Sequence, residues 1–155
     1  MIINVPQTGK YHIENIVFDY NGTIANDGII IDGILKRIVD LSKNFNVHII
    51  TADTFNTVKE SFKGTNVNVY IIDKDFGSEQ KEKFIDKLGF DKTIALGNGR
   101  NDQLMLKKSI ISIAVLNDEG VSVKAINSAD FLIKDINNFF DMIEKPKKMI
   151  AILRK

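Results

Sequence analysis

The sequence predicts a doubly wound α/β domain built on a parallel sheet, and three observations lead to that prediction. Short apolar runs rich in β-branched residues alternate with segments of helical periodicity, the connections are short, and polar residues directly follow several of the apolar runs. This alternation is typical of a parallel sheet covered by helices on both faces and joined by right-handed crossovers. With 155 residues, 44% hydrophobic and 26% charged, the chain has the composition of a globular domain, which excludes disordered and coiled-coil proteins.

The expected elements can be given in chain order. Residues 2–5 and 11–13 flank Gly9 and predict an N-terminal β-hairpin. Strands are expected over 16–18, 47–50, 67–72, 93–96, 110–116 and 131–133, and helices over 34–41, 54–62, 78–88, 102–108 and 121–126, before two terminal helices. Asp53 is the expected N-cap of the helix over 54–62. Because we find no internal repeat and no linker, we expect one domain over residues 1–155.

Composition and charge exclude several classes of protein and site. The absence of cysteine excludes disulfides, thiolate metal sites and cysteine nucleophiles. The two histidines, His12 and His48, fall in expected strands, and we interpret both as structural. A net charge of +1 gives no attraction to nucleic acid or to an anionic membrane. Since there is no signal peptide and no apolar run of about 20 residues, we expect a cytoplasmic protein that is not in a membrane.

Residues that can take part in catalysis or ligand binding follow three of the expected strands. The strand over 16–18 leads into DYNGT (19–23), the strand over 47–50 into TAD (51–53), and the strand over 93–96 into GNGRND (97–102). Ligands of open α/β sheets bind beyond the carboxyl ends of the strands, so these three segments are expected to converge. Lys81, in the helix before the third strand, adds an ammonium group to the set.

This set of groups suits phosphoryl transfer. The Asp19 carboxylate can attack phosphorus, and Gly22 lets backbone N–H groups approach a phosphate. Thr51 can donate a hydrogen bond to a phosphate oxygen, and Lys81 can offset the charge on the transferring group. Asp102, together with oxygens of the Asp19 turn, can hold Mg²⁺, which prefers oxygen ligands.

The ordered motifs resemble those of the haloacid dehalogenase superfamily, and over residues 15–135 the phosphorylation domain of P-type ATPases in particular. DYNGT is similar to the DKTGT of those ATPases, TAD to their TGD, and GNGRND to their GDGxND. The whole chain resembles the small, capless soluble P-type ATPase-like proteins. The resemblance implies a Rossmann-like fold and a Mg²⁺-dependent phosphohydrolase or phosphotransferase acting on a phosphorylated substrate.

The resemblance also assigns roles to the matched positions. It implies catalytic roles for Asp19, Asn21, Thr51 and Lys81, and phosphate contacts for Gly22, Thr51, Ala52 and Lys81. It implies a Mg²⁺ site formed by Asp19, Asn21, Asn98 and Asp102, with support from Thr23, Asp53 and Asn101. The segments 24–50 and 52–80 leave room for a flap, one helix each and one strand, so neither a cap domain nor an ATPase-type nucleotide domain is expected.

Two departures from the family pattern bear on the activity. Phosphatases of the superfamily have an aspartate general acid/base where this chain has Asn21, and an acidic Mg²⁺ ligand where it has Asn98. Because an amide cannot transfer a proton at neutral pH, we expect slow turnover through an aspartyl-phosphate on Asp19. The alternative is a regulatory module that binds phosphate or a phosphorylated ligand without turnover.

Simpler interpretations stay open for individual residues. Asp19 could only cap a turn, Thr51 could be an ordinary strand-end residue, and Asp53 and Asp102 could only cap helices. A response-regulator receiver domain also uses Asp, Thr and Lys, but its phospho-acceptor follows a later strand than Asp19 does here. A homo-oligomer is kept as an alternative to a monomer.

Overall fold

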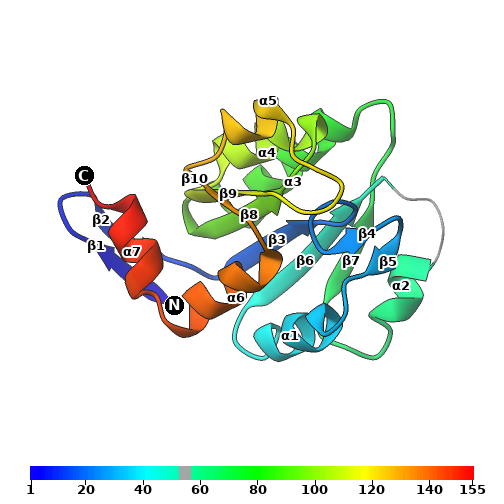
Figure 1. Ribbon diagram of the computed structural model, residues 1–155, viewed down its shortest axis with the longest axis horizontal. Coiled ribbons are helices and arrows are strands. Elements are labelled where there is room, and N and C mark those ends of the chain that lie inside the picture. Colours follow the sequence, from blue (N-terminus) through cyan, green and yellow to red (C-terminus); the bar gives the residue numbers. More distant parts are fainter. Residues whose placement is uncertain (53–56) are drawn as a thin grey trace.

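The computed structural model describes residues 1–52 and 57–155 and contains a central six-stranded sheet (Figure 1). The strand order is β10-β9-β8-β3-β6-β7, and all neighbouring pairs run parallel. The strands are β3 (Asn15–Asp19), β6 (Asn46–Thr51), β7 (Asn68–Ile71), β8 (Thr93–Gly97), β9 (Ile111–Val115) and β10 (Phe131–Ile133). The doubly wound α/β prediction is therefore confirmed, and β3 lies in the middle of the sheet between β6 and β8.

Helices cover both faces of the sheet (Figure 1). One face carries α1 (Ile34–Leu41), α2 (Thr57–Ser61) and α6 (Ile136–Glu144), and the other carries α3 (Gly77–Leu88), α4 (Gln103–Lys108) and α5 (Val123–Ile126). Alternation along β3 explains the two layers, because Ile16 and Phe18 face the first set of helices and Val17 faces the second. A strand that is buried on both faces must be apolar throughout, as the core of β3 is.

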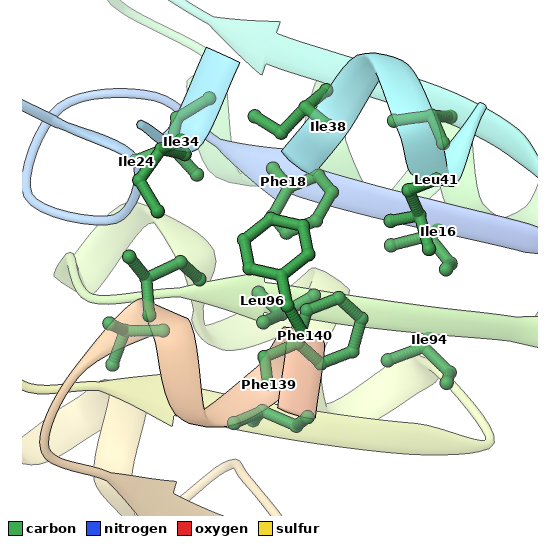
Figure 2. Close-up of a cluster of buried hydrophobic side chains, with 14 of the residues drawn as sticks. Ile16, Phe18, Ile24, Ile34, Ile38, Leu41, Ile94, Leu96, Phe139 and Phe140 are labelled. Carbon is green, nitrogen blue, oxygen red and sulfur yellow. The ribbon is translucent and has the colours of Figure 1, made fainter. Parts of the chain in front are cut away.

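The larger core lies between the sheet and helices α1 and α6 (Figure 2). Phe18 is at its centre, with ring centroids 5.5 Å from Phe139 in an edge-to-face arrangement and 6.0 Å from the stacked ring of Phe140. Such aromatic pairs add stability beyond the area that they bury. This packing holds β3, and with it Asp19 at the strand's end, in a fixed position.

Two small antiparallel hairpins are added to the sheet. The predicted N-terminal hairpin is confirmed as β1 (Ile2–Val5) and β2 (Gly9–His12), and α7 (Lys147–Leu153) packs against β1. The second hairpin, β4 (Ala25–Asn26) and β5 (Ile29–Ile30), lies between β3 and α1, and we call residues 25–30 the flap. Among the described residues, the segment between β3 and α1 contains only this flap as regular structure.

Several predicted helix boundaries shift in the structure. Residues Arg100–Asp102 form a 3-10 turn, η2, before α4, and another such turn, η1, spans Phe90–Lys92. The α5 helix begins at Val123 because the Ser122 hydroxyl caps it by accepting a hydrogen bond from the Lys124 N–H. The predicted N-cap Asp53 lies outside the described residues. Over the described ranges, every helix is too short or too polar to cross a bilayer.

Candidate active site

A cavity of about 650 Å³ opens at the carboxyl ends of β3 and β6. It is lined by Asp19, Asn21, Asp27, Gly28, Thr51, Ala52, Lys74, Asn98, Gly99 and Asn101. Three predicted segments meet there because β6 and β8 both pair with β3 in parallel register, which brings their ends to one edge. A second cavity, of about 460 Å³, lies between α1 and α6 and is lined by none of the residues predicted to carry chemistry.

Asp19 is joined to two other charged groups behind the cavity wall. The ammonium of Lys81 lies 2.5 Å from Oδ1 of Asp19 and 2.6 Å from Oδ1 of Asp102. Lys81 and Asp102 are fully buried, whereas the Asp19 side chain keeps about a tenth of its surface exposed. In this group, which we call the charged triad, the Lys81 ammonium lies between the carboxylates of Asp19 and Asp102.

Burial and charge act on the triad in opposite directions. Burial lowers the pKa of Lys81, but the charges of Asp102 and Asp19 outweigh it, so the pKa is raised and the ammonium stays charged. Burial, followed by the negative charge of Asp102, raises the pKa of Asp19 to about 6 despite the opposing effect of Lys81. The triad therefore has one cation for two carboxylates, and an added positive charge beside Asp19 would stabilise it.

Asp102 also organises the loop that follows β8. Its Oδ2 accepts hydrogen bonds from the N–H groups of Asn98, at 3.0 Å, and Gly99, at 2.8 Å. Only glycine fits at position 97, because a Cβ there would lie 2.5 Å from the Asp102 carboxyl carbon. Asp102 thus does not line the cavity itself but holds Lys81 and the loop after β8 in place beside it.

Asn98 bridges the glycine turn after Asp19 and a loop on the far side of the cavity. Its Nδ2 donates to the Gly120 carbonyl at 3.2 Å, and its Oδ1 lies 3.4 Å from the Thr23 hydroxyl. Gly22 has φ +76°, and a Cβ there would collide with the Asn98 side chain. The close approach of turn and loop therefore requires glycine at position 22.

Asn21 is hydrogen-bonded to the flap. Its Oδ1 accepts from the Gly28 N–H at 2.9 Å, and the Tyr20 hydroxyl donates to the Gly28 carbonyl at 3.0 Å. The Asp27 N–H donates to Oε1 of Glu119 at 2.6 Å. Residues 27 and 28 are thus held at the cavity from two sides, by β3 and by the loop that follows β9.

The structure brings most predicted site residues together. Asp19, Asn21, Thr51, Ala52, Asn98 and Asn101 line the cavity, Gly22 and Thr23 are buried in the turn beneath it, and Lys81 and Asp102 lie behind Asp19. Asp53 lies outside the described residues. Sequence reasoning missed Asp27, Gly28, Lys74 and Glu119. The Asp-Gly pair at 27–28, a typical two-residue hairpin turn, could have indicated the flap. Lys74 and Glu119 lie in irregular loops that no motif or periodic pattern marks.

The residues present fit a hard divalent cation. Among the described residues, no three His, Cys, Asp or Glu side chains are close enough to form a metal site by themselves. Asp19, however, faces a cavity whose other lining groups include amide oxygens, and oxygen donors of this kind suit Mg²⁺. The unbalanced negative charge of the triad favours the same cation.

No protein-family profile matches the chain. An uncharacterised protein of Methanocaldococcus jannaschii is 39% identical over 85 residues, which are 51% of this chain and 91% of that protein.

Solved structures show where the fold occurs. The 3-deoxy-D-manno-octulosonate 8-phosphate phosphatase of Moraxella catarrhalis, in complex with magnesium ion, phosphate ion and the KDO molecule, superimposes with a TM-score of 0.65 at 15% identity, over 90% of each chain. The catalytic domain of the CPx-ATPase CopB-B gives a TM-score of 0.61 at 26% identity, over 75% of this chain and 46% of that one. Haloacid dehalogenase hydrolases are also among the similar folds. The chain belongs to one family with the Methanocaldococcus jannaschii protein, and its fold is that of the haloacid dehalogenase superfamily.

Proposed function

We propose that this protein is a Mg²⁺-dependent phosphatase or phosphotransferase that acts through an aspartyl-phosphate on Asp19. One observation carries the proposal: Asp19 faces the cavity at the end of β3 while its carboxylate is held by the buried Lys81. The match to a solved phosphatase fold supports phosphohydrolase chemistry in general.

In the first step, an oxygen of Asp19 forms a bond to phosphorus as the bond from phosphorus to the leaving-group oxygen breaks. Thr51 and the backbone N–H groups around Gly22 and Ala52 hold the phosphoryl oxygens. Lys81 keeps Asp19 oriented and offsets negative charge near it. In the second step, water attacks phosphorus, which releases phosphate and restores the Asp19 carboxylate.

Both steps lack a proton carrier at position 21. The first step needs a proton for the leaving group, and the second needs one removed from water, but the Asn21 amide can do neither. Acyl and aryl phosphates, whose leaving groups need little protonation, are therefore the favoured substrates. Hydrolysis of the aspartyl-phosphate is expected to be the slower step.

Asp19 and oxygens of Asn21 and Asn98 would hold the magnesium ion. Asp102, which the sequence also predicts as a ligand, is fully buried with both oxygens bonded to other groups, so its role here would be to hold the loop that carries Asn98. When bound, the ion neutralises charge on the phosphoryl group as it transfers. The surrounding residues position Asp19 and exclude water from the triad.

A binding module without turnover is the second candidate, and the contacts of two residues favour it. Asn21 and Asn98, at the two positions where the superfamily has acids, are both hydrogen-bonded to backbone groups. In that case the cavity would hold a phosphorylated ligand and release it unchanged.

Hydrolysis of p-nitrophenyl phosphate with and without Mg²⁺ separates the two candidates. We expect Mg²⁺-dependent turnover and an acid-stable phosphoprotein in the wild type, and neither in Asp19→Asn. Undiminished turnover in that variant would overturn the role of Asp19. Phosphate binding without any turnover on a broad panel of phosphate esters would favour the binding module.

A further inference from the structure

The loop between β7 and α3 contributes Lys74 to the lining of the cavity. At its start, the Ile72 N–H donates to the Thr51 carbonyl at 2.9 Å. At its end, a Cβ on Gly77 would lie 3.9 Å from Nδ2 of Asn101, which is ordinary contact distance. Thr51 and Asn101 both line the cavity, so the residues between the two ends of the loop pass along its rim, and Lys74 among them lines the cavity.

The ammonium of Lys74 is available to a ligand. Among the described residues that line this cavity, Lys74 is the one with a positively charged side chain. No carboxylate of the described residues lies within ion-pair distance of its ammonium. Lys81 differs, because it is fully buried and its ammonium is held between two carboxylates.

Hydrogen bonds on either side of Lys74 hold the loop backbone. The Asp73 N–H donates to Oε1 of Gln80 at 3.2 Å, and the Asp75 N–H donates to Oδ1 of Asp73 at 2.9 Å. The flap residue Asp27 also lines the cavity, so the lining carries a cation from the loop and a carboxylate from the flap. Of these two lining side chains, Lys74 attracts an anionic group of a ligand and Asp27 repels it.

The volume of the cavity also indicates a ligand larger than phosphate. At about 650 Å³ it lies within the range of roughly 300–1,000 Å³ found for small-molecule sites, so the leaving group has room within it. We propose that Lys74 forms a second anion subsite, and that the preferred substrates are phosphate monoesters whose leaving group carries a carboxylate or a second phosphate. This inference rests on the proposed function, because it places the reacting phosphoryl group at Asp19.

The test compares esters that differ in the charge of the leaving group. Phenyl phosphate, 4-carboxyphenyl phosphate and 1,4-phenylene bisphosphate, which all have aryl leaving groups, are assayed with saturating Mg²⁺, in the wild type and in Lys74→Gln. We expect kcat/KM for the two anionic esters to fall by about ten-fold in the variant, at the low end for bonds to charged groups because the site is exposed. The loss for phenyl phosphate should be several-fold smaller. Lys36→Gln, which removes an exposed lysine of α1, is the matched control and should leave the ratio between the esters unchanged.

A binding measurement separates failure of this inference from failure of the proposed function. Calorimetry on Asp19→Asn, with and without Lys74→Gln, gives the affinities for 4-carboxyphenyl phosphate and phenyl phosphate without turnover. Selective weakening of 4-carboxyphenyl phosphate binding by Lys74→Gln supports the subsite even if the protein proves inactive. Equal weakening of both esters would mean that Lys74 contacts the phosphoryl group itself. That result, or no weakening at all, overturns the inference while leaving Asp19 chemistry unaffected.

Discussion

At the scale of single residues, Asn21 and Asn98 differ in how many of their side-chain amide groups are hydrogen-bonded. Asn21 uses its Oδ1 to accept from the Gly28 N–H, and a carboxylate oxygen could accept the same bond. Both polar atoms of the Asn98 amide have partners, because its Nδ2 donates to the Gly120 carbonyl and its Oδ1 lies near the Thr23 hydroxyl. An aspartate is therefore compatible with position 21, but at position 98 it would place a carboxylate against a carbonyl.

Restoring the missing acid at position 21 should increase turnover. In Asn21→Asp, one carboxylate oxygen can keep the Gly28 contact and the other can exchange a proton with the leaving group or with water. We expect phosphatase turnover to rise about ten-fold or more, at the low end of usual acid–base contributions. Pre-steady-state kinetics should show a burst in the wild type that shrinks in the variant. Asn101→Asp adds the same charge elsewhere in the cavity lining and is the control, and an equal gain there would indicate a general charge effect.

His48 provides a prediction for the pH dependence of stability. Its ring is buried beside Tyr70 and Phe84, with centroids at 5.9 and 5.5 Å, and neither nitrogen has a hydrogen-bond partner among the described residues. Burial lowers its pKa from 6.5 to about 4, so between these values the unfolded chain binds a proton that the folded protein does not. Stability contributed by neutral His48 is therefore complete above pH 6.5 and is lost as the pH falls toward 4.

Denaturant unfolding at pH 7 and pH 4.5 measures this contribution. The pH-dependent loss should be smaller in His48→Phe by roughly 2 kcal/mol, at 1.36 kcal/mol per pKa unit. His12→Asn removes the exposed histidine of β2 and should keep the wild-type dependence. An unchanged pH dependence in His48→Phe would show that His48 titrates normally in the folded protein.

At the scale of elements, the flap is a very short hairpin that depends on contacts with its neighbours. Two residues on each strand give too little structure for independent stability, as expected for such hairpins. Its tip is held by Asn21 and Tyr20 from the end of β3 and by Glu119 from the loop after β9. The latter loop is itself joined to Asn98 through Gly120, so flap and glycine turn share one network.

Removing the Glu119 carboxylate should loosen the flap. In Glu119→Ala, the Asp27 amide loses its acceptor, and we expect its hydrogen exchange to accelerate about ten-fold, as for the loss of one hydrogen bond to a charged group. KM for substrates should rise because the flap lines the cavity, whereas unfolding stability should change little. Asp118→Ala removes the neighbouring exposed carboxylate as a control. If the Asp27 amide exchanges equally fast in wild type and Glu119→Ala, then Glu119 does not hold the flap.

At the scale of the whole molecule, Lys81 connects the sheet to two helical segments. Its ammonium joins β3 through Asp19 and η2 through Asp102, while its backbone belongs to α3. Because all three groups are buried, removing the cation leaves two carboxylates facing each other without compensation. The same groups thus shape the site and join three parts of the fold.

Loss of this cation should be costly to stability. We expect Lys81→Met to lower the free energy of unfolding by about 3–5 kcal/mol, measured with denaturant in EDTA. Adding Asp19→Asn should restore part of the loss, since it removes one of the two opposed charges. Lys83→Met, on the exposed face of α3, is expected to change stability by no more than about 0.5 kcal/mol. A Lys81→Met protein as stable as the wild type would contradict the pairing of the triad.

The sheet, its two helical layers and the location of the site could be predicted from the amino-acid sequence alone. Continuous apolar runs such as Ile16 to Phe18 predict strands that are buried on both faces, because such strands must be apolar throughout. Neighbouring parallel strands also have their carboxyl ends at the same edge of the sheet, so the proximity of Asp19 and Thr51 could be predicted from the sequence.

Which groups contact one another at that edge could not be predicted in the same way. That Lys81 lies between Asp19 and Asp102, and that Asn98 bonds to Gly120, depends on packing between elements far apart in the chain. The positions of Lys74 and Glu119 depend on irregular loops, whose paths are set by a few hydrogen bonds. A periodic pattern records which face of an element is buried, but a single long-range hydrogen bond leaves no periodic signal in the sequence.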